Sequence, residues 1–201
     1  MNPIIAFLIL DEDVRERRTR HVGSYVATVL NTYYNEEFKR DFRMQKNVYE
    51  YIKNEIKVEW TRYISIETAL LCFIYAVCTG ECFRSLASRF AISATSVSIV
   101  IEHVARLIIK HLGFQISHNL SAEEIAVQQF LFGRHYGQSD AVAAMDGCFC
   151  SIKRPDSHGE QYYNRHKKQY GMNMLAIVDF NAKFLYILTG NSGKVGDSLI
   201  F

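Results

Sequence analysis

The chain has 201 residues, of which 49% are hydrophobic and 22% charged, so it can form a folded core and does not have the composition of a disordered protein. The net charge of +2 is too small by itself to indicate nucleic-acid binding. Five cysteines are an odd number without the density of a disulfide scaffold, which favours reduced thiols.

Two apolar runs raise the question of export or membrane insertion. Residues 4–10 have no basic segment before them and no small-residue cleavage site after them, so they do not resemble a signal peptide. Residues 69–78 fall well short of the ~20 apolar residues that cross a bilayer. We therefore expect neither a signal sequence nor a membrane partner.

The first half of the chain is predicted to be helical. Apolar residues recur at spacings of three and four over residues 22–34 and 48–56. Residues 38–44 between them form a compact aromatic and basic element. Ser65 is expected to cap a nearly all-apolar helix over residues 66–78, which would be buried on most sides.

A helix-turn-helix-like unit is predicted next. Residues 83–90 have the apolar spacing of a two-turn helix, and residues 91–93 form a turn in which Ser93 caps a longer helix. A helical hairpin that only packs a core is the alternative. The outward face of the longer helix carries one acid, Glu102, and one arginine, Arg106, a poor set for reading bases.

The cysteine positions leave two interpretations open. Cys78 and Cys82 stand four residues apart and could share a helix face as half of a zinc site, although burial as small apolar side chains is the favoured interpretation. Cys148 and Cys150 would face the same side of a strand, where packing is again favoured.

The second half changes to β-structure after a helix that begins near Ser121. Strands are predicted over residues 141–152, 172–180 and 184–189, with a tight hairpin turn at residues 179–182. Asp146 lies at the end of the first apolar strand, and Asp197 follows a glycine-rich loop. The two carboxylates could share a hard divalent cation, or they could serve as a turn residue and a helix cap.

An ordered series of short motifs resembles the DDE endonuclease domain of the PIF/Harbinger transposase superfamily, including the harbinger transposase-derived nucleases. The series comprises residues 144–147, 152–155, 163–165, Asn173, 178–179 and 193–198. Phe42-Arg43-Met44 and the helical segment after it fit the N-terminal half of the same superfamily. The resemblance extends from about residue 20 to the end of the chain.

The resemblance implies an RNase H-like fold that cleaves DNA with a divalent metal, Mg²⁺ or Mn²⁺. Asp146 matches the superfamily's first catalytic acid, and Asp197 matches the acid of its Gly-Ser-x-x-Asp-Ser element. The resemblance makes both residues catalytic and metal-binding, with Asp197 as a supporting ligand. Arg165, Lys167 and Lys168 would contact DNA phosphates, or else form a solvated basic loop.

Two departures from the superfamily pattern bear on activity. Asn191-Ser192-Gly193 stands where Pro-Gly-Ser is usual. The sequence also stops before the strand and helix that carry the remaining acids, so we expect little or no nuclease activity in this form and an unpaired sheet edge.

The sequence thus predicts an α+β protein with four segments. These are an N-terminal helical region (1–64), a helix-turn-helix-like unit (65–120), a helix and connection (121–140), and the first part of an incomplete RNase H-like DDE domain (141–201). The expected function is a Harbinger-type DNA endonuclease or transposase, and the alternative is a non-catalytic DNA- or protein-binding remnant. The expected partners are DNA and a separate Myb-like DNA-binding protein. The nucleus is the expected location, with the cytoplasm as second choice.

Overall fold

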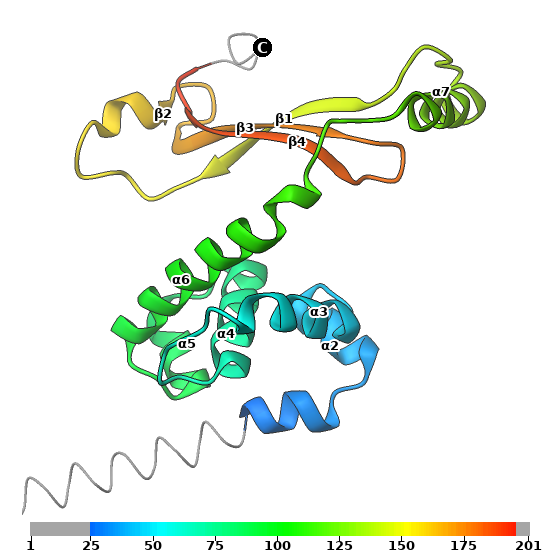
Figure 1. Ribbon diagram of the computed structural model, residues 1–201. Coiled ribbons are helices and arrows are strands. Elements are labelled where there is room, and N and C mark those ends of the chain that lie inside the picture. Colours follow the sequence, from blue (N-terminus) through cyan, green and yellow to red (C-terminus); the bar gives the residue numbers. More distant parts are fainter. Residues whose placement is uncertain (1–24, 196–201) are drawn as a thin grey trace, which may run out of the picture. The chain divides into compact units, whose positions relative to one another are not determined.

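The computed structural model describes residues 25–195, which fall into two compact units, Met1–Gly113 and Phe114–Phe201 (Figure 1). The first unit is helical, and the second combines helices with an antiparallel sheet. The predicted α+β class is confirmed. Asp197 lies outside the described residues.

Five labelled helices follow the helical residues 25–32 in the first unit. They are α2 (Asn35–Phe42), α3 (Lys46–Lys57), α4 (Ile66–Thr79), α5 (Phe83–Phe90) and α6 (Ala94–Leu112), and the 3₁₀ turn η1 (Gly113–Gln115) follows α6. Each helix predicted in this half is found, with ends shifted by a few residues.

Helix α4 forms the centre of the first unit. The Ser65 hydroxyl accepts the Thr68 N–H at 3.2 Å, so the predicted N-cap is confirmed. Seven of its residues are buried, as the apolar sequence predicts: Ile66, Thr68, Ala69, Leu70, Leu71, Cys72 and Ile74. A helix with so few exposed positions can only be stable when other helices surround it.

Aromatic rings pack the short helix α2 against its neighbours. The rings of Phe38 and Phe42 stack with centroids 4.6 Å apart, and Phe38 meets Tyr49 of α3 edge-on at 5.5 Å. Phe42 also meets Tyr75 of α4 at 5.8 Å. These contacts explain how eight residues, too few for a stable isolated helix, form one here.

Helices α5 and α6 meet at 95° across the predicted turn. The Ser93 hydroxyl accepts the Ser96 N–H at 3.0 Å, which confirms it as the N-cap of α6. Ala91 ends α5 in a left-handed conformation, with φ of 47°. In the described part of the chain no single helix is long and apolar enough to cross a membrane, although this bent pair taken together has that length and composition.

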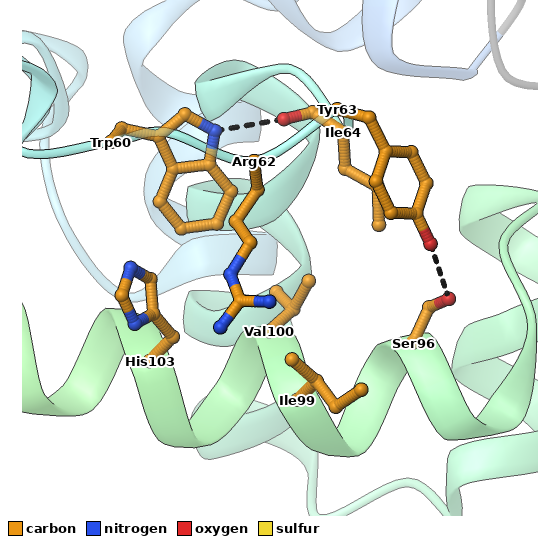
Figure 2. A pocket seen from close by; sticks show the side chains of 8 residues that line it. All are labelled: Trp60, Arg62, Tyr63, Ile64, Ser96, Ile99, Val100 and His103. Carbon is orange, nitrogen blue, oxygen red and sulfur yellow. Dashed lines mark hydrogen bonds between the residues drawn. The ribbon is translucent and has the colours of Figure 1, made fainter.

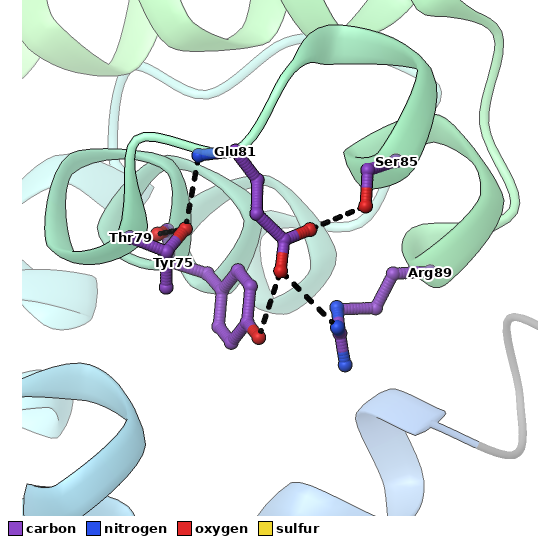
Figure 3. Close-up of polar contacts among 5 residues, drawn as sticks. All are labelled: Tyr75, Thr79, Glu81, Ser85 and Arg89. Carbon is purple, nitrogen blue, oxygen red and sulfur yellow. Dashed lines mark hydrogen bonds and ion pairs between the residues drawn. The ribbon is translucent and has the colours of Figure 1, made fainter.

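A polar network joins the end of α4 to α5 (Figure 3). The Glu81 carboxylate accepts hydrogen bonds from the hydroxyls of Ser85 and Tyr75 and from the guanidinium of Arg89. Arg89 also lies over the Tyr75 ring at 4.6 Å. The Ser85 hydrogen bond and the nearby Arg89 hold the pKa of Glu81 below its usual value, although partial burial acts in the opposite direction.

The second unit begins with α7 (Ala122–Tyr136) and continues into the sheet. The strands are β1 (Ala144–Ser151), β2 (Tyr163–Asn164), β3 (Gln169–Val178) and β4 (Phe184–Ser192), and the 3₁₀ turn η2 (Gly159–Tyr162) precedes β2. Strand β3 is central and pairs antiparallel with β1, β2 and β4. The three predicted strands are present, whereas β2 and η2 were not predicted.

The turn between β3 and β4 is longer than predicted. It covers residues 179–183. The Asp179 carboxylate accepts the Lys183 N–H at 2.8 Å, and the Asp179 carbonyl accepts the Ala182 N–H at 3.0 Å. Next to this turn, Gln128 of α7 accepts the Phe180 N–H at 2.9 Å, and Phe132 meets the Phe180 ring at 5.5 Å. These contacts fix α7 to one end of the sheet.

Strand β1 has one side without a partner among residues 25–195, because all of its pairing is with β3. An edge strand exposes alternate N–H and C=O groups that another strand could pair with.

Candidate functional site: an acidic strand and a basic hairpin

Asp146 is the third residue of β1 and lies opposite Ala176 of β3. The strand therefore continues past Asp146, which is not at the strand's end as the sequence pattern predicts. Its side chain is exposed, and one carboxylate oxygen accepts the Gly147 N–H at 2.8 Å. An exposed carboxylate keeps its hydration, so no buried partner is needed to stabilise its charge.

One face of β1 carries Asp146 together with Cys148 and Cys150, since side chains two residues apart share a face of a strand. Both cysteines are exposed free thiols. Partial burial, with the neighbouring Cys148, raises the pKa of the Cys150 thiol. Over residues 25–195 no three His, Cys, Asp or Glu side chains gather as a metal site.

The segment that leads toward Asp197 is tied to the sheet by three hydrogen bonds. The Gly193 N–H donates to the Gly171 carbonyl at 2.9 Å, and the Asn164 amide donates to the Gly193 carbonyl at 2.8 Å. The buried Asn173 amide donates to the carbonyl of Val195. Buried asparagines that hold a loop backbone in this way fix its course.

Glycine is required where this segment lies close to β3. A Cβ built on Gly171 would lie 2.7 Å from the Cys150 carbonyl oxygen and closer still to the Phe149 ring. A Cβ on Gly193 would lie 2.9 Å from the same ring. The two backbones approach closely only because neither residue has a side chain.

The anchored segment and Asp146 lie on different faces of the sheet. Asn173, which holds Val195, is opposite Phe149 in the β1–β3 register, and Asp146 is three residues from Phe149. An odd separation along a strand places two side chains on opposite faces. The described residues of the segment therefore do not meet Asp146, and Asp197 lies outside them.

The predicted DNA-contacting residues lie on the hairpin that joins β2 to β3. Arg165, Lys167 and Lys168 are all exposed, and Lys168 has a left-handed backbone with φ of 53°. The Lys167 ammonium lies 5.0 Å from the Phe149 ring centre, while its backbone N–H donates to Asn164. The hairpin thus presents three cations within four residues.

Three further residues join Arg165 in an open hollow of about 630 Å³ that the sequence patterns did not indicate. They are Tyr163, Tyr170 and Lys194, and Glu160 is the acid in the lining. The tyrosine rings lie 5.1 Å apart, and Arg154 lies over the Tyr170 ring at 5.8 Å. We call Arg154, Tyr163, Arg165, Lys167, Lys168, Tyr170 and Lys194 the hairpin cluster. Such alternation of cations and rings suits a nucleic-acid strand.

Cys78 and Cys82 do not share a helix, so the zinc half-site considered for them is wrong. Cys78 lies in α4, whose end is capped by Gly80, and Cys82 is the residue before α5. The Cys78 thiol donates instead to the Phe42 carbonyl at 3.3 Å. Its role is to pack α4 against α2.

Two family models match the chain. Residues 18–110 match a model described as "Domain of unknown function (DUF8040)". No curated protein and no solved structure matches the chain. The second match covers β1, the hairpin cluster and the segment toward Asp197: residues 145–201 are similar to the family described as "DDE superfamily endonuclease".

Proposed function

We propose that this chain carries part of a Harbinger-type transposase or transposase-derived DNA endonuclease. The observation that carries the proposal is the match of residues 145–201 to the DDE superfamily endonuclease model. Asp146 lies within the matched segment, on an exposed face of its first strand.

Asp146 would be a ligand of a divalent cation, Mg²⁺ or Mn²⁺. Carboxylate oxygens are the ligands that such hard cations prefer, and an exposed carboxylate can take one without a large desolvation penalty. Asp197 is the second ligand in this proposal. When bound, the metal would supply charge stabilisation and activation of water for phosphodiester cleavage.

The hairpin cluster would hold the DNA. Within residues 25–195 its Arg165, Lys167 and Lys168 make no ion pair with a carboxylate, so their charges are available to phosphates. Each neutralised phosphate contributes to a salt-dependent affinity through counterion release. Tyr163 and Tyr170 add ring surfaces against which an unpaired base can stack.

Metal-dependent cleavage of supercoiled plasmid tests the catalytic half of this proposal. The expected result is nicking that requires Mg²⁺ or Mn²⁺ and is lost in Asp146→Asn, which removes the charge and keeps the shape. Asp156→Asn is the matched control, because Asp156 is another exposed acid of the same unit. Cleavage that persists in Asp146→Asn, or fails equally in Asp156→Asn, would contradict the role of Asp146.

DNA binding without cleavage is the second candidate, and the geometry of α5 and α6 favours it. Two helices at 95° across a three-residue turn are compatible with the helix-turn-helix arrangement. The exposed arginine of α6 is already engaged, however, because Arg106 pairs with Glu102 at 2.8 Å. Contacts to phosphates, and not to base edges, are therefore expected.

Fluorescence-anisotropy titration of duplex DNA at several salt concentrations tests this second candidate. A binding remnant would bind in Asp146→Asn as well as in the wild type, with little dependence on sequence. If the hairpin cluster holds the DNA, Arg165→Gln with Lys167→Gln would reduce the salt slope by about 0.9 for each phosphate that is no longer neutralised. An unchanged slope would remove the cluster from the DNA interface.

A weak base-reading face is compatible with specificity supplied by another protein. We therefore keep a separate Myb-like DNA-binding protein and a nuclear location as parts of the proposal. Co-purification from nuclear extract with tagged wild-type chain would test both.

A further inference from the structure

A small pocket lies in the first unit, between residues 60–64 and α6 (Figure 2). It is a small hollow that opens to solvent. Its walls are mostly apolar and aromatic: Trp60, Tyr63, Ile64, Ile99 and Val100, with Arg62, Ser96 and His103.

The wall of this pocket is held in place by specific contacts. The Trp60 indole N–H donates to the Ile64 carbonyl at 2.8 Å, which closes the segment on itself. The Tyr63 hydroxyl is 3.2 Å from the Ser96 hydroxyl of α6. The Trp60 ring lies 5.3 Å from the His103 ring. Because these contacts preform the pocket, a ligand would lose little binding energy to ordering it.

Arg62 gives the pocket one positive charge that no lining residue balances. Its lining contains Arg62 and His103 but no acid. The nearest acids along these segments already have partners, since Glu59 pairs with Lys110 and Glu102 with Arg106. Within the described part of the chain, Arg62 forms no ion pair.

One polar atom in the pocket lacks a partner. Nε2 of His103 is buried and makes no hydrogen bond to any described residue. Figure 2 shows the Arg62 guanidinium extended toward α6, beside His103 and Val100 in that view. An acceptor placed at this point would bind the guanidinium and satisfy the imidazole, which otherwise stays buried without a hydrogen bond.

We propose that this pocket binds an acidic peptide segment of a partner protein, which inserts one large apolar side chain next to an Asp or Glu. The apolar side chain would fill the space between Ile64, Ile99 and Val100. The neighbouring carboxylate would accept hydrogen bonds from Arg62 and His103. This inference does not rest on the proposed nuclease function.

A polypeptide fits the pocket better than the other ligand classes. Tyr63 is 89% exposed and Ile99 45% exposed, so the rim has apolar surface that a protein segment would cover and a small molecule would leave in water. A DNA backbone would meet one arginine and a mostly apolar wall, from which phosphates gain nothing. The apolar floor with a cationic edge matches the complementary pattern of an amphipathic acidic peptide.

Trp60 makes the pocket directly observable, because it is the chain's one tryptophan. Its fluorescence would be titrated in the full chain with three short acetylated, amidated peptides without Trp or Tyr. One contains Glu and Leu, the second replaces Glu by Lys, and the third replaces Leu by Ala. We expect a saturable change in emission with the Glu/Leu peptide and at least tenfold weaker binding of the other two.

Substitutions in the pocket lining, with a control on α6, separate the pocket from general surface effects. Ile99→Lys and Arg62→Gln should each weaken Glu/Leu binding by about tenfold or more, as expected when an apolar side chain or a charged hydrogen bond is removed. Ile109→Lys is the matched control, because Ile109 is 72% exposed on α6 and does not line the pocket. Circular dichroism of each variant confirms that it is folded.

The proposal is overturned by any of four results. These are no saturable change in Trp60 emission, equal binding of the Lys/Leu peptide, a response unaffected by Arg62→Gln, or equal weakening by Ile109→Lys. A titration with a duplex oligonucleotide, done in parallel, tests whether the pocket binds DNA instead of a peptide. If it changes Trp60 emission and competes with the Glu/Leu peptide, the pocket belongs to a DNA surface.

Discussion

A single carboxylate, Glu81, connects the end of α4 to the side chains of α5. It accepts hydrogen bonds from Ser85, Tyr75 and Arg89, and its own N–H donates to the Thr79 hydroxyl at 3.3 Å. Because all three side chains donate to the carboxylate, these hydrogen bonds stabilise its ionised form, which has no proton of its own. The lowered pKa of Glu81 records this preference.

Glu81→Gln is expected to lower the free energy of unfolding of the first unit by about 1 kcal/mol at pH 7. Because the folded-state pKa of Glu81 is below the unfolded value, its contribution is complete above the unfolded pKa and is lost as pH falls through the folded pKa. Thermal unfolding at several pH values should show the wild-type advantage shrinking below about pH 4.

Glu102→Gln serves as the control for that experiment, since its pair with Arg106 is an exposed i,i+4 contact on α6. Such pairs contribute less than about 0.5 kcal/mol. An advantage of Glu81 that does not change with pH would mean that packing, and not charge, holds this turn.

We expect the cysteines to differ in reactivity because their burial differs. Cys72 is fully buried in α4, and burial raises the pKa of its thiol to about 12. Cys82, Cys148 and Cys150 are exposed. Titration with a thiol-reactive disulfide at pH 8 should modify the three exposed thiols readily and Cys72 only after denaturation. Fast modification of Cys72 in the folded chain would mean that α4 opens locally.

At the scale of elements, the close approach of β3 to β1 at Gly171 is a demanding contact. Gly171→Ala would drive a methyl group into the Phe149 ring and the Cys150 carbonyl. Overpacking of this kind costs about 1–3 kcal/mol. Chemical denaturation followed by far-UV circular dichroism should show the second unit unfolding earlier in this variant.

Gly113→Ala is the matched control, since a Cβ there meets nothing within 4 Å and its φ is −58°. Alanine at this position is expected to be neutral or slightly stabilising. If both variants lose equal stability, the contact with Phe149 does not explain the effect.

The helices and long strands could be predicted because each carries its own pattern. Ser65 and Ser93 precede apolar runs and cap α4 and α6 as expected. The two-residue strand β2 could not be predicted, because it exists only through its pairing with Tyr170 and Gln169. Strands this short have too few residues to show alternation.

The candidate site was predicted only in part, because only some of its residues can be found from local sequence patterns. The sequence identified Asp146 and the exposed cations Arg165, Lys167 and Lys168 on the hairpin. It missed Lys194 and the pair Tyr163 and Tyr170, which come together only when the hairpin and the segment after β4 are folded. The opposite faces of Asp146 and Asn173 also depend on the register between β1 and β3.

At the scale of the whole molecule, the two units have separate hydrophobic cores. The main core cluster is built from residues of the first unit alone, from Val26 to Leu107. The second unit relies on fewer buried apolar side chains, among them Phe132, Leu175 and Leu185. Stability is therefore expected to differ between them.

Phe42→Ala should show that the two units unfold separately. Removing a fully buried ring that contacts Phe38 and Tyr75 costs about 3–5 kcal/mol. Because Trp60 lies in the first unit, its fluorescence should report an earlier transition in Phe42→Ala and an unchanged one in Gly171→Ala. A shift of the Trp60 transition in both variants would show that the units unfold as one.

The side of β1 that no strand within residues 25–195 pairs with has a practical consequence for handling the protein. Where two copies meet along this strand, Cys148 and Cys150 of each copy come onto neighbouring strands, and both are exposed thiols. Air oxidation would then convert a weak, concentration-dependent association into a covalent one. Storage without reductant should therefore produce a reducible dimer band on gels, and freshly reduced, dilute samples should not.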